Sequence, residues 1–173
     1  MKTSKVGLMI GLFCIISLLS VSDYAMIPDN LIKNEEPVDI LSSDFWNLTS
    51  STIFIDDSDP NYNWSKMAIE NDWISGLGTW DDPYRIENVT LIGNNTASGI
   101  KIQNSYNVYF VINNCSVSNS TLGIELINVN NGTVENNDIN NNTDMGISLQ
   151  NCKNITIENN QRCIPLFILV VVF

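Results

Sequence analysis

The chain writes the six residues Gly99-Ile-Lys-Ile-Gln-Asn104 again as Gly123-Ile-Glu-Leu-Ile-Asn128, 24 residues later, and as Gly146-Ile-Ser-Leu-Gln-Asn151, after 23 more. A second unit follows each copy, in residues 107–114 (NVYFVINN), 131–137 (NGTVENN) and 154–160 (NITIENN). Self-similarity at this period indicates stacked supersecondary units. The sequence therefore predicts an all-β fold, a right-handed parallel β-helix of about three to four coils.

Apolar side chains occupy the second and fourth positions of each copy. These positions hold Ile100 and Ile102, then Ile124 and Leu126, then Ile147 and Leu149. Such alternation is typical of a half-buried strand. Coils of a parallel sheet lie about 4.8 Å apart, so like side chains form a column. Each buried aliphatic side chain contributes on the order of 1.5–3 kcal/mol.

Asparagine is the other repeated feature, with 17 in residues 104–160. Asn tolerates the left-handed backbone conformation that sharp corners need, and its amide can bond the Asn of the next coil. We expect two structural ladders, one of Asn104, Asn128 and Asn151 and one of Asn113, Asn136 and Asn159. Ligand binding by these amides is the alternative role.

The repeats divide the chain into regions. We assign residues 88–161 to the β-helix, residues 52–87 to an N-terminal cap and residues 23–51 to a polar linker. Within the cap, residues 52–56 have strand character, and a short helix over 66–72, after a candidate N-cap Ser65, would close the end of the solenoid. Residues 162–173 form an irregular apolar tail, which is either a final strand or cap or the artefact of a truncated or frameshifted reading frame; we favour the artefact.

Residues 1–22 have the pattern of a secretory signal peptide. Lys2 and Lys5 precede an apolar run over residues 6–19, and Ser20-Val-Ser22 supplies small residues before a cleavage point. An uncleaved anchor is the alternative, although the run is shorter than the roughly 18–20 apolar residues of a membrane span. We expect a secreted or cell-surface protein that contacts a membrane only if this leader stays attached.

The chain is strongly acidic, with a net charge of -11. Without the leader, the chain has six basic and 19 acidic residues, so its net charge is -13. Phosphate binding needs a basic face, so nucleic acid is excluded as a partner. The acidity either keeps the chain soluble or attracts divalent cations.

A longer phrase leads into the first coil: Gly76-Leu-Gly-Thr-Trp-Asp-Asp-Pro-Tyr-Arg-Ile-Glu-Asn88, followed by Val-Thr-Leu91. With the G-I-x-I/L-x-N coils, it resembles the opening of secreted archaeal and bacterial right-handed β-helix proteins. These are similar to the pectin-lyase-like superfamily and to the periplasmic copper-binding family of nitrous-oxide reductase maturation. The resemblance covers about residues 53–161 and implies a fold more than a function. Copper binding is not carried over, because the chain has no histidine and Met145 stands apart from the scattered cysteines.

The absence of histidine from the sequence excludes Ser-His-Asp and Cys-His catalysis. A polysaccharide-cleaving relative would need clustered carboxylates, and glycoside hydrolysis places two of them about 5–9.5 Å apart. Glu135 and Glu158 are the candidates, because their 23-residue offset stacks them on adjacent coils, with Asp138 and Asp144 nearby. The alternative is a pair of solvated glutamates, which we favour, and no catalytic residue is assigned. Lys101 and Glu125 occupy equivalent positions and are expected to form an exposed ion pair.

Two further groups of residues are candidate ligand sites. Asp57 and Asp59 begin an alternation of oxygen-bearing side chains that is typical of a calcium loop, although its Gly and final Glu are missing; a turn is the favoured alternative. Ca²⁺ is therefore the one candidate cofactor, with Glu135 and Glu158 as further candidate ligands. Trp64, Trp73 and Trp80 can stack on sugar rings, and packing within the cap is their alternative role.

Cys115, Cys152 and Cys163 remain after the leader is removed. Cys115 has the position of a buried thiol, and a disulfide between Cys152 and Cys163 is compatible with the sequence but not required. Nine N-x-S/T triplets are present, at Asn47, Asn63, Asn88, Asn94, Asn114, Asn119, Asn131, Asn141 and Asn154. Exposed ones can carry glycans if the chain leaves the cell.

Two hypotheses for function follow. The first is a secreted or surface β-helix without catalytic activity, a structural or adhesive module whose side holds a polysaccharide or cell-surface glycan. The second is the N-terminal fragment of a polysaccharide lyase or glycoside hydrolase whose catalytic coils lie beyond Gln161.

Overall fold

The computed structural model describes residues 45–161 and 168–171, which belong to one compact unit spanning Leu41–Phe173. The predicted signal peptide, most of the linker and Cys163 lie outside the described residues. The elements are β1 (Trp46–Asn47), β2 (Ile53–Asp56), α1 (Trp64–Glu70), β3 (Ile74–Ser75), β4 (Tyr84–Glu87), β5 (Val89–Ile92), β6 (Ile100–Ser105), β7 (Phe110–Asn113), β8 (Ser116–Ser118), β9 (Leu122–Glu135), β10 (Asp138–Asn140), β11 (Met145–Gln150), β12 (Lys153–Glu158) and β13 (Ile168–Val171).

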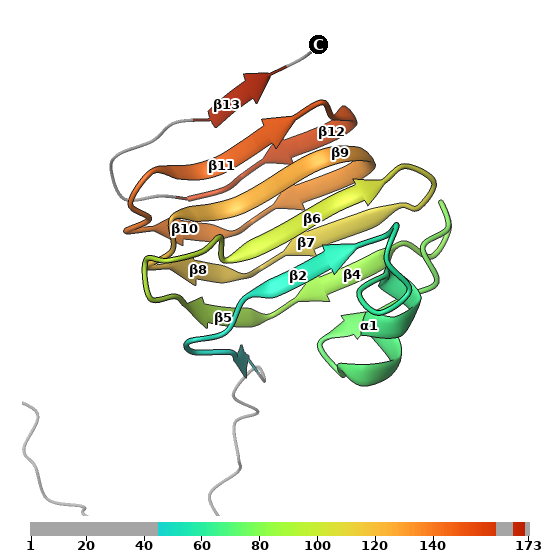
Figure 1. Cartoon of the computed structure of the whole chain (residues 1–173), viewed down its shortest axis with the longest axis horizontal. Helices are drawn as coiled ribbons and strands as arrows, with labels where there is room; N and C mark the ends of the chain where they lie inside the picture. Colours follow the sequence, from blue (N-terminus) through green and yellow to red (C-terminus); the bar gives the residue numbers. More distant parts are fainter. Residues whose placement is uncertain (1–44, 162–167, 172–173) are drawn as a thin grey trace, which may run out of the picture. The chain divides into compact units, whose positions relative to one another are not determined.

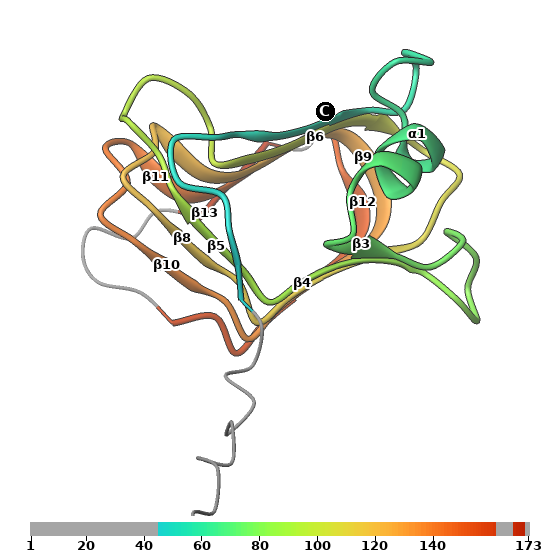
Figure 2. The same ribbon diagram turned by 90° about the horizontal axis from the view of Figure 1, so that it is seen from below.

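The strands form three parallel sheets that enclose a common interior, as the view along the stack shows (Figure 2). Sheet A has the order β1-β5-β8-β10, and sheet B has the order β2-β6-β9-β11-β13. Sheet C has the order β3-β4-β7-β9-β12, with β3 the antiparallel member. The 14-residue strand β9 bends and serves both sheets B and C.

Each coil runs through the sheets in the order B, C, A (Figure 1). The first coil is β2, β4 and β5, the second is β6, β7 and β8, the third is β9 and β10, and the fourth begins with β11 and β12. Ile100 pairs with Ile124, and Ile124 pairs with Ile147, so like positions form the predicted columns. The parallel β-helix of three to four coils is confirmed.

The solenoid begins earlier than residue 88, where the sequence placed it. Strand β2 pairs with β6, and β1 in the predicted linker pairs with β5. The sequence period misses this first coil because an insertion containing α1 separates β2 from β4, so that Ile53 pairs with Ile100, 47 residues away. At the other end, residues 168–171 of the predicted irregular tail form β13 along the edge of β11. These aliphatic residues have high strand propensity, and the edge of β11 offers unpaired backbone groups.

Glycine opens the first two copies of the repeat because the coils approach closely there. A Cβ atom on Gly99 would lie 2.9 Å from the carbonyl oxygen of Gly123. A Cβ atom on Gly123 would lie 2.5 Å from the carbonyl oxygen of Gly146. Both distances are shorter than a Cβ atom can accept from backbone, so a side chain at these positions would separate neighbouring coils.

Helix α1 carries an aromatic side chain into the core. Its N-cap is Asn63 rather than the predicted Ser65, and Asn63 Oδ1 accepts a hydrogen bond from the backbone N–H of Lys66 (2.9 Å). The helix therefore begins at Trp64, which is 1% exposed and stacks on Tyr84 with ring centroids 5.1 Å apart. Within the described residues no helix is both long and apolar enough to cross a membrane.

Asparagines occupy the corners between sheets. Of the 13 non-glycine residues with positive φ among the described residues, 12 are Asn, as expected for the residue that best tolerates this conformation. In the first ladder, Asn128 Nδ2 donates to Asn104 Oδ1 (3.1 Å), and Asn151 Nδ2 donates to Asn128 Oδ1 (2.7 Å). The predicted ladder of Asn104, Asn128 and Asn151 is confirmed.

The second ladder is shifted by one residue in the second coil. Its corner members are Asn88, Asn114, Asn136 and Asn159, whose φ angles lie between 51° and 58°. Asn113, the predicted member, ends strand β7 in register with Glu135 and is not the corner residue. Its Oδ1 nevertheless accepts a hydrogen bond from Asn136 Nδ2 (3.0 Å), so the predicted contact between Asn113 and Asn136 is present. Asn113 was chosen wrongly because inward packing sets the register: Phe110 pairs with Gly132 and Ile112 with Val134. Asn113 is the next residue of the strand, so its side chain points outward and the corner falls at Asn114.

A third set of asparagines points inward and was not predicted. Asn137 is fully buried, and its Oδ1 accepts from the backbone N–H of Cys115 (2.9 Å) while its Nδ2 donates to the carbonyl of Ile112 (3.0 Å). Asn160 makes the equivalent bonds to the coil before it, at Asn137 N (3.0 Å) and Val134 O (2.8 Å). These amides satisfy backbone groups where the chain turns from sheet C to sheet A, and no buried side-chain N or O atom in the described residues lacks a partner.

Asp56 ends the first ladder on the first coil. Burial opposes its ionisation, but hydrogen bonds from Ser58, Gln103 and Asn104 outweigh burial and lower its pKa to about 2. Gln103 Nε2 and Asn104 Nδ2 donate to its carboxylate at 2.6 and 3.0 Å. Because the folded pKa lies below the ordinary 3.8, ionised Asp56 contributes stability that is present above pH 3.8 and is lost as pH falls toward 2.

We therefore expect an Asp56→Asn variant to have a lower Tm than the parent at pH 6, and a difference from the parent that shrinks at pH 2.5. Thermal unfolding followed by circular dichroism at both pH values measures this. Asp59→Asn is the matched control, because the Asp59 carboxylate accepts hydrogen bonds only from Asn61 in its own turn among the described residues. Parallel pH profiles for Asp56→Asn and the parent would contradict the assignment.

Candidate functional site

The outward faces of the three sheets differ in charge. Sheet B carries Asp56 and the predicted ion pair of Lys101 and Glu125, with Nζ and Oε2 3.3 Å apart. The pair is half-buried rather than exposed as predicted. Sheet C carries the pair of Arg85 and Glu87 and, further along, the column of Glu135 and Glu158. On sheet A, the described outward side chains are mostly uncharged hydroxyls and amides, with Asp138 as their one charged group.

One line of these side chains crosses every rung of sheet A. The register pairs Asn47 with Thr90, Thr90 with Ser116, Ser116 with Asp138, and Asp138 with Gln161. We name these five residues the polar row. Neighbouring members are separated by one rung, about 4.8 Å, so the row presents evenly spaced hydrogen-bonding groups along the solenoid.

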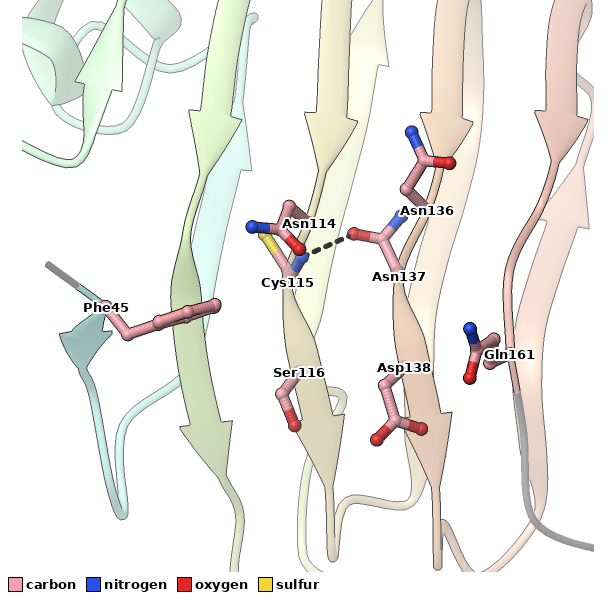
Figure 3. A pocket seen from close by; sticks show the side chains of 8 residues that line it. All are labelled: Phe45, Asn114, Cys115, Ser116, Asn136, Asn137, Asp138 and Gln161. Atoms are coloured by element: carbon pink, nitrogen blue, oxygen red, sulfur yellow. Dashed lines mark hydrogen bonds between the residues drawn. The ribbon is translucent and has the colours of Figure 1, made fainter. Parts of the chain in front are cut away.

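A groove of about 210 Å³ lies over part of the polar row (Figure 3). Phe45 extends across β5 toward β8, and Ser116 and Asp138 lie on the neighbouring strands β8 and β10. Asn114, Asn136 and Gln161 complete the polar lining, with Cys115 and Asn137 behind it. Phe45 is 44% exposed, so part of its ring is available to a ligand.

Cys115 lies at the groove but is chemically inert. It is 1% exposed, and burial raises its pKa to about 11. Its Sγ donates to the carbonyl of Asn113 at 3.3 Å. The group is therefore a neutral thiol at physiological pH and cannot act as a thiolate nucleophile. Burial also raises the pKa of Cys152, which forms no disulfide within the described residues.

The groove lining combines hydrogen-bonding side chains with one aromatic ring. Hydroxyl, amide and carboxylate groups can donate to and accept from sugar hydroxyls. An aromatic ring such as Phe45 offers an apolar face for the C–H groups of a sugar ring. The volume is below the roughly 300–1,000 Å³ of typical drug-sized pockets, so the groove has room for a small group or for one part of a larger ligand.

The predicted carboxylate site lies elsewhere. Glu135 and Glu158 are in register on adjacent strands of sheet C, as predicted, and the same column contains Glu87 and Asn113. Asp138 lies on sheet A and Asp144 on the exposed loop after β10, so the four acids do not share one face. In the part of the chain that the structure describes, no three Asp, Glu, Cys or His side chains come together as a metal site.

The segment considered as a calcium loop forms a hydrogen-bonded turn, the alternative that the sequence favoured. Asp59 Oδ1 accepts from the backbone N–H and the Nδ2 of Asn61 (2.9 and 3.1 Å), and Asn63 caps α1. Burial raises the pKa of Asp57 and so disfavours the ionised carboxylate that would bind a cation. Asp59 Oδ1 and Asn63 Oδ1 are therefore engaged in the turn and the helix cap.

The three tryptophans do not form one platform. Trp64 is buried in the core and cannot bind a sugar, so its alternative role of packing is the correct one. Trp73 is half-buried against the same core. Trp80 is 74% exposed and packs edge-to-face on Tyr109, with centroids 5.4 Å apart, so it alone of the three presents most of its surface to solvent.

The groove residues were missed for an identifiable reason. Phe45 lies in the stretch interpreted as a linker, and Ser116, Asp138 and Gln161 are polar residues two positions after a corner Asn. Asn88, Asn114, Asn136 and Asn159 are followed at the second position by Thr90, Ser116, Asp138 and Gln161. This recurring spacing is the signal that marks the polar row in the sequence.

Comparison with known proteins agrees with the geometry. The sequence model of the family described as "Right handed beta helix region" matches residues 30–161, so the chain belongs to this family, and the predicted right-handed solenoid is confirmed. A search of curated proteins and a search of solved structures each found no significant match.

Proposed function

We propose that this chain is a secreted or cell-surface β-helix protein without catalytic activity that binds a polysaccharide or surface glycan along sheet A. The polar row and its groove carry this proposal. A polysaccharide repeats its hydroxyl groups at regular intervals, and the row repeats hydrogen-bonding side chains at the coil spacing. Phe45 adds the aromatic contact.

The charge of sheet A favours a neutral or weakly charged glycan. Asp138 is the one charged side chain of the polar row, whereas sheets B and C carry several. An anionic polysaccharide would meet repulsion from an acidic chain of net charge -11. Binding rather than hydrolysis follows from the lining as well, since glycoside hydrolysis uses a pair of carboxyl groups and the described groove lining contains one.

A glycan array followed by affinity electrophoresis on soluble polysaccharides tests the proposal. We expect retention by at least one neutral polysaccharide, and Phe45→Ala should weaken it by about two- to tenfold, because an aromatic contact is worth roughly 0.5–1.5 kcal/mol. Trp80→Ala is the matched control, an exposed aromatic residue outside the groove, and should leave retention unchanged.

Three results would contradict the proposal. A flat response across all glycans would remove carbohydrate binding, and a loss caused by Trp80→Ala alone would move the site off sheet A. Release of new reducing ends from a retained polysaccharide would replace binding with hydrolysis. Circular dichroism of each variant confirms that a loss of retention does not reflect unfolding.

A further inference from the structure

The nine N-x-S/T triplets fall into distinct structural classes. Six of their asparagines are corner residues with φ between 51° and 58°: Asn88, Asn114, Asn119, Asn131, Asn141 and Asn154. The other three have ordinary backbone conformations: Asn47, Asn63 and Asn94. The structure therefore separates triplets that build the solenoid from those available for modification.

The corner amides are engaged in stacking. Asn114 Nδ2 donates to Asn88 Oδ1 (2.8 Å), and Asn154 Nδ2 donates to Asn131 Oδ1 (2.8 Å). A glycan replaces one of the two hydrogens on Nδ2, and neighbouring coils about 4.8 Å apart leave no room for a sugar between them. Attachment here would compete with the ladder.

The remaining corner triplets are held by their hydroxyl residues. Thr121 Oγ1 of the Asn119 triplet donates to the carbonyl of Asn95 (3.3 Å), and Thr143 Oγ1 of the Asn141 triplet donates to the carbonyl of Ser120 (3.5 Å). Each threonine therefore faces a neighbouring coil rather than its own asparagine. Asn63 is excluded differently, because it is half-buried and caps α1.

Asn94 has the opposite arrangement. It lies in the loop between β5 and β6, where residues 94–97 are all exposed. Its Oδ1 accepts hydrogen bonds from both the backbone N–H and the Oγ1 of Thr96, the hydroxyl residue of its own triplet. Its Nδ2 has no hydrogen-bond partner in the part of the chain that the structure describes. Asn47 makes the same turn with Thr49, but its neighbours bond into sheet A through Trp46 N and Leu48 N.

We propose that Asn94 is a site of N-linked glycosylation. The Nδ2 atom forms a bond to C1 of a saccharide carried on a phosphate ester, the C1–O bond to the phosphate breaks, and the departing phosphate takes the electron pair. One amide proton leaves to a base. A glycosyltransferase of the exporting compartment supplies the donor, and the loop presents Asn94 with Thr96 already beside it. This proposal does not depend on glycan binding by sheet A.

Glycopeptide mapping of the full chain secreted from a eukaryotic cell line tests the site. Peptide N-glycosidase converts a glycosylated Asn to Asp, which marks the position by mass. We expect the mark at Asn94, and we expect Asn94→Gln and Thr96→Ala each to lower the intact mass by one glycan. Thr96→Ala keeps the acceptor and removes only its recognition.

Asn141→Gln is the matched control, since Asn141 is also exposed and also followed by threonine at the second position. It should leave the glycan mass unchanged. An unmodified Asn94 in the secreted chain overturns the proposal, and so does a glycan on Asn114, Asn131 or Asn154. Because the readout is mass, failure here is separate from failure of the polysaccharide-binding assay.

Discussion

Replacing Trp64 with alanine should lower the free energy of unfolding by about 3–5 kcal/mol, the range for truncating a buried aromatic side chain. Trp64 is 1% exposed and packs between Tyr84 and Phe110, with ring centroids 5.1 and 5.4 Å away. Its Nε1 also donates to Ser105 Oγ, itself fully buried, at 2.9 Å. Truncation therefore leaves a cavity and removes the partner of a buried hydroxyl.

Denaturant unfolding of two further variants separates these contributions. Trp64→Phe keeps an aromatic ring and loses the hydrogen bond, so it should cost less than alanine. Trp80→Ala removes an indole that is 74% exposed and should stay within about 0.5 kcal/mol of the parent. Equal costs for Trp64→Ala and Trp80→Ala would mean that α1 does not deliver Trp64 to the core.

The second large effect is expected from Asn137→Ala, at about 2–5 kcal/mol. The variant leaves the backbone N–H of Cys115 and the carbonyl of Ile112 without their side-chain partner in a buried region. Each orphaned buried group costs about 1–3 kcal/mol. Urea unfolding measures the loss, and hydrogen exchange should show faster exchange at the Cys115 amide.

Its neighbour Asn136 provides the control. Asn136 is an exposed corner residue with φ of 55°, a conformation that glycine adopts without strain. Asn136→Gly should therefore cost less than about 1 kcal/mol. If Asn137→Ala proves no more destabilising than Asn136→Gly, the inward amide is not what satisfies the turn between sheets C and A.

The regular part of this fold could be predicted because its cause is periodic. An apolar pattern that alternates every two residues and recurs in every coil can be recognised in a single sequence. This pattern predicted the column of Ile100, Ile124 and Ile147 and the ladder that starts at Asn104. The pair of Lys101 and Glu125 followed from the same register. These features need no knowledge of what surrounds them.

The parts that could not be predicted depend on tertiary context. The first coil is hidden by the insertion that carries α1, and Asn113 was misplaced because inward packing of Phe110 over Gly132, rather than matching of Asn pairs, sets the register. Phe45, Ser116 and Asp138 line one groove only because neighbouring coils stack and bring these distant residues together. A groove built from separate rungs has no contiguous motif, so only the spacing after each corner Asn could have indicated it.

The pairing of Leu122 with Met145 has a consequence for how such a gene can change. Excising residues 123–145 would place Gly146 directly after Leu122, and the shortened chain would keep every remaining side chain on its own face. A deletion one residue longer or shorter would move the inward side chains of the downstream strand to its outward face, because neighbouring strand residues point to opposite faces. Deletions and duplications that begin and end within strands should therefore survive only as whole turns of the solenoid, whereas loops can change length by single residues, as the 24- and 23-residue offsets show.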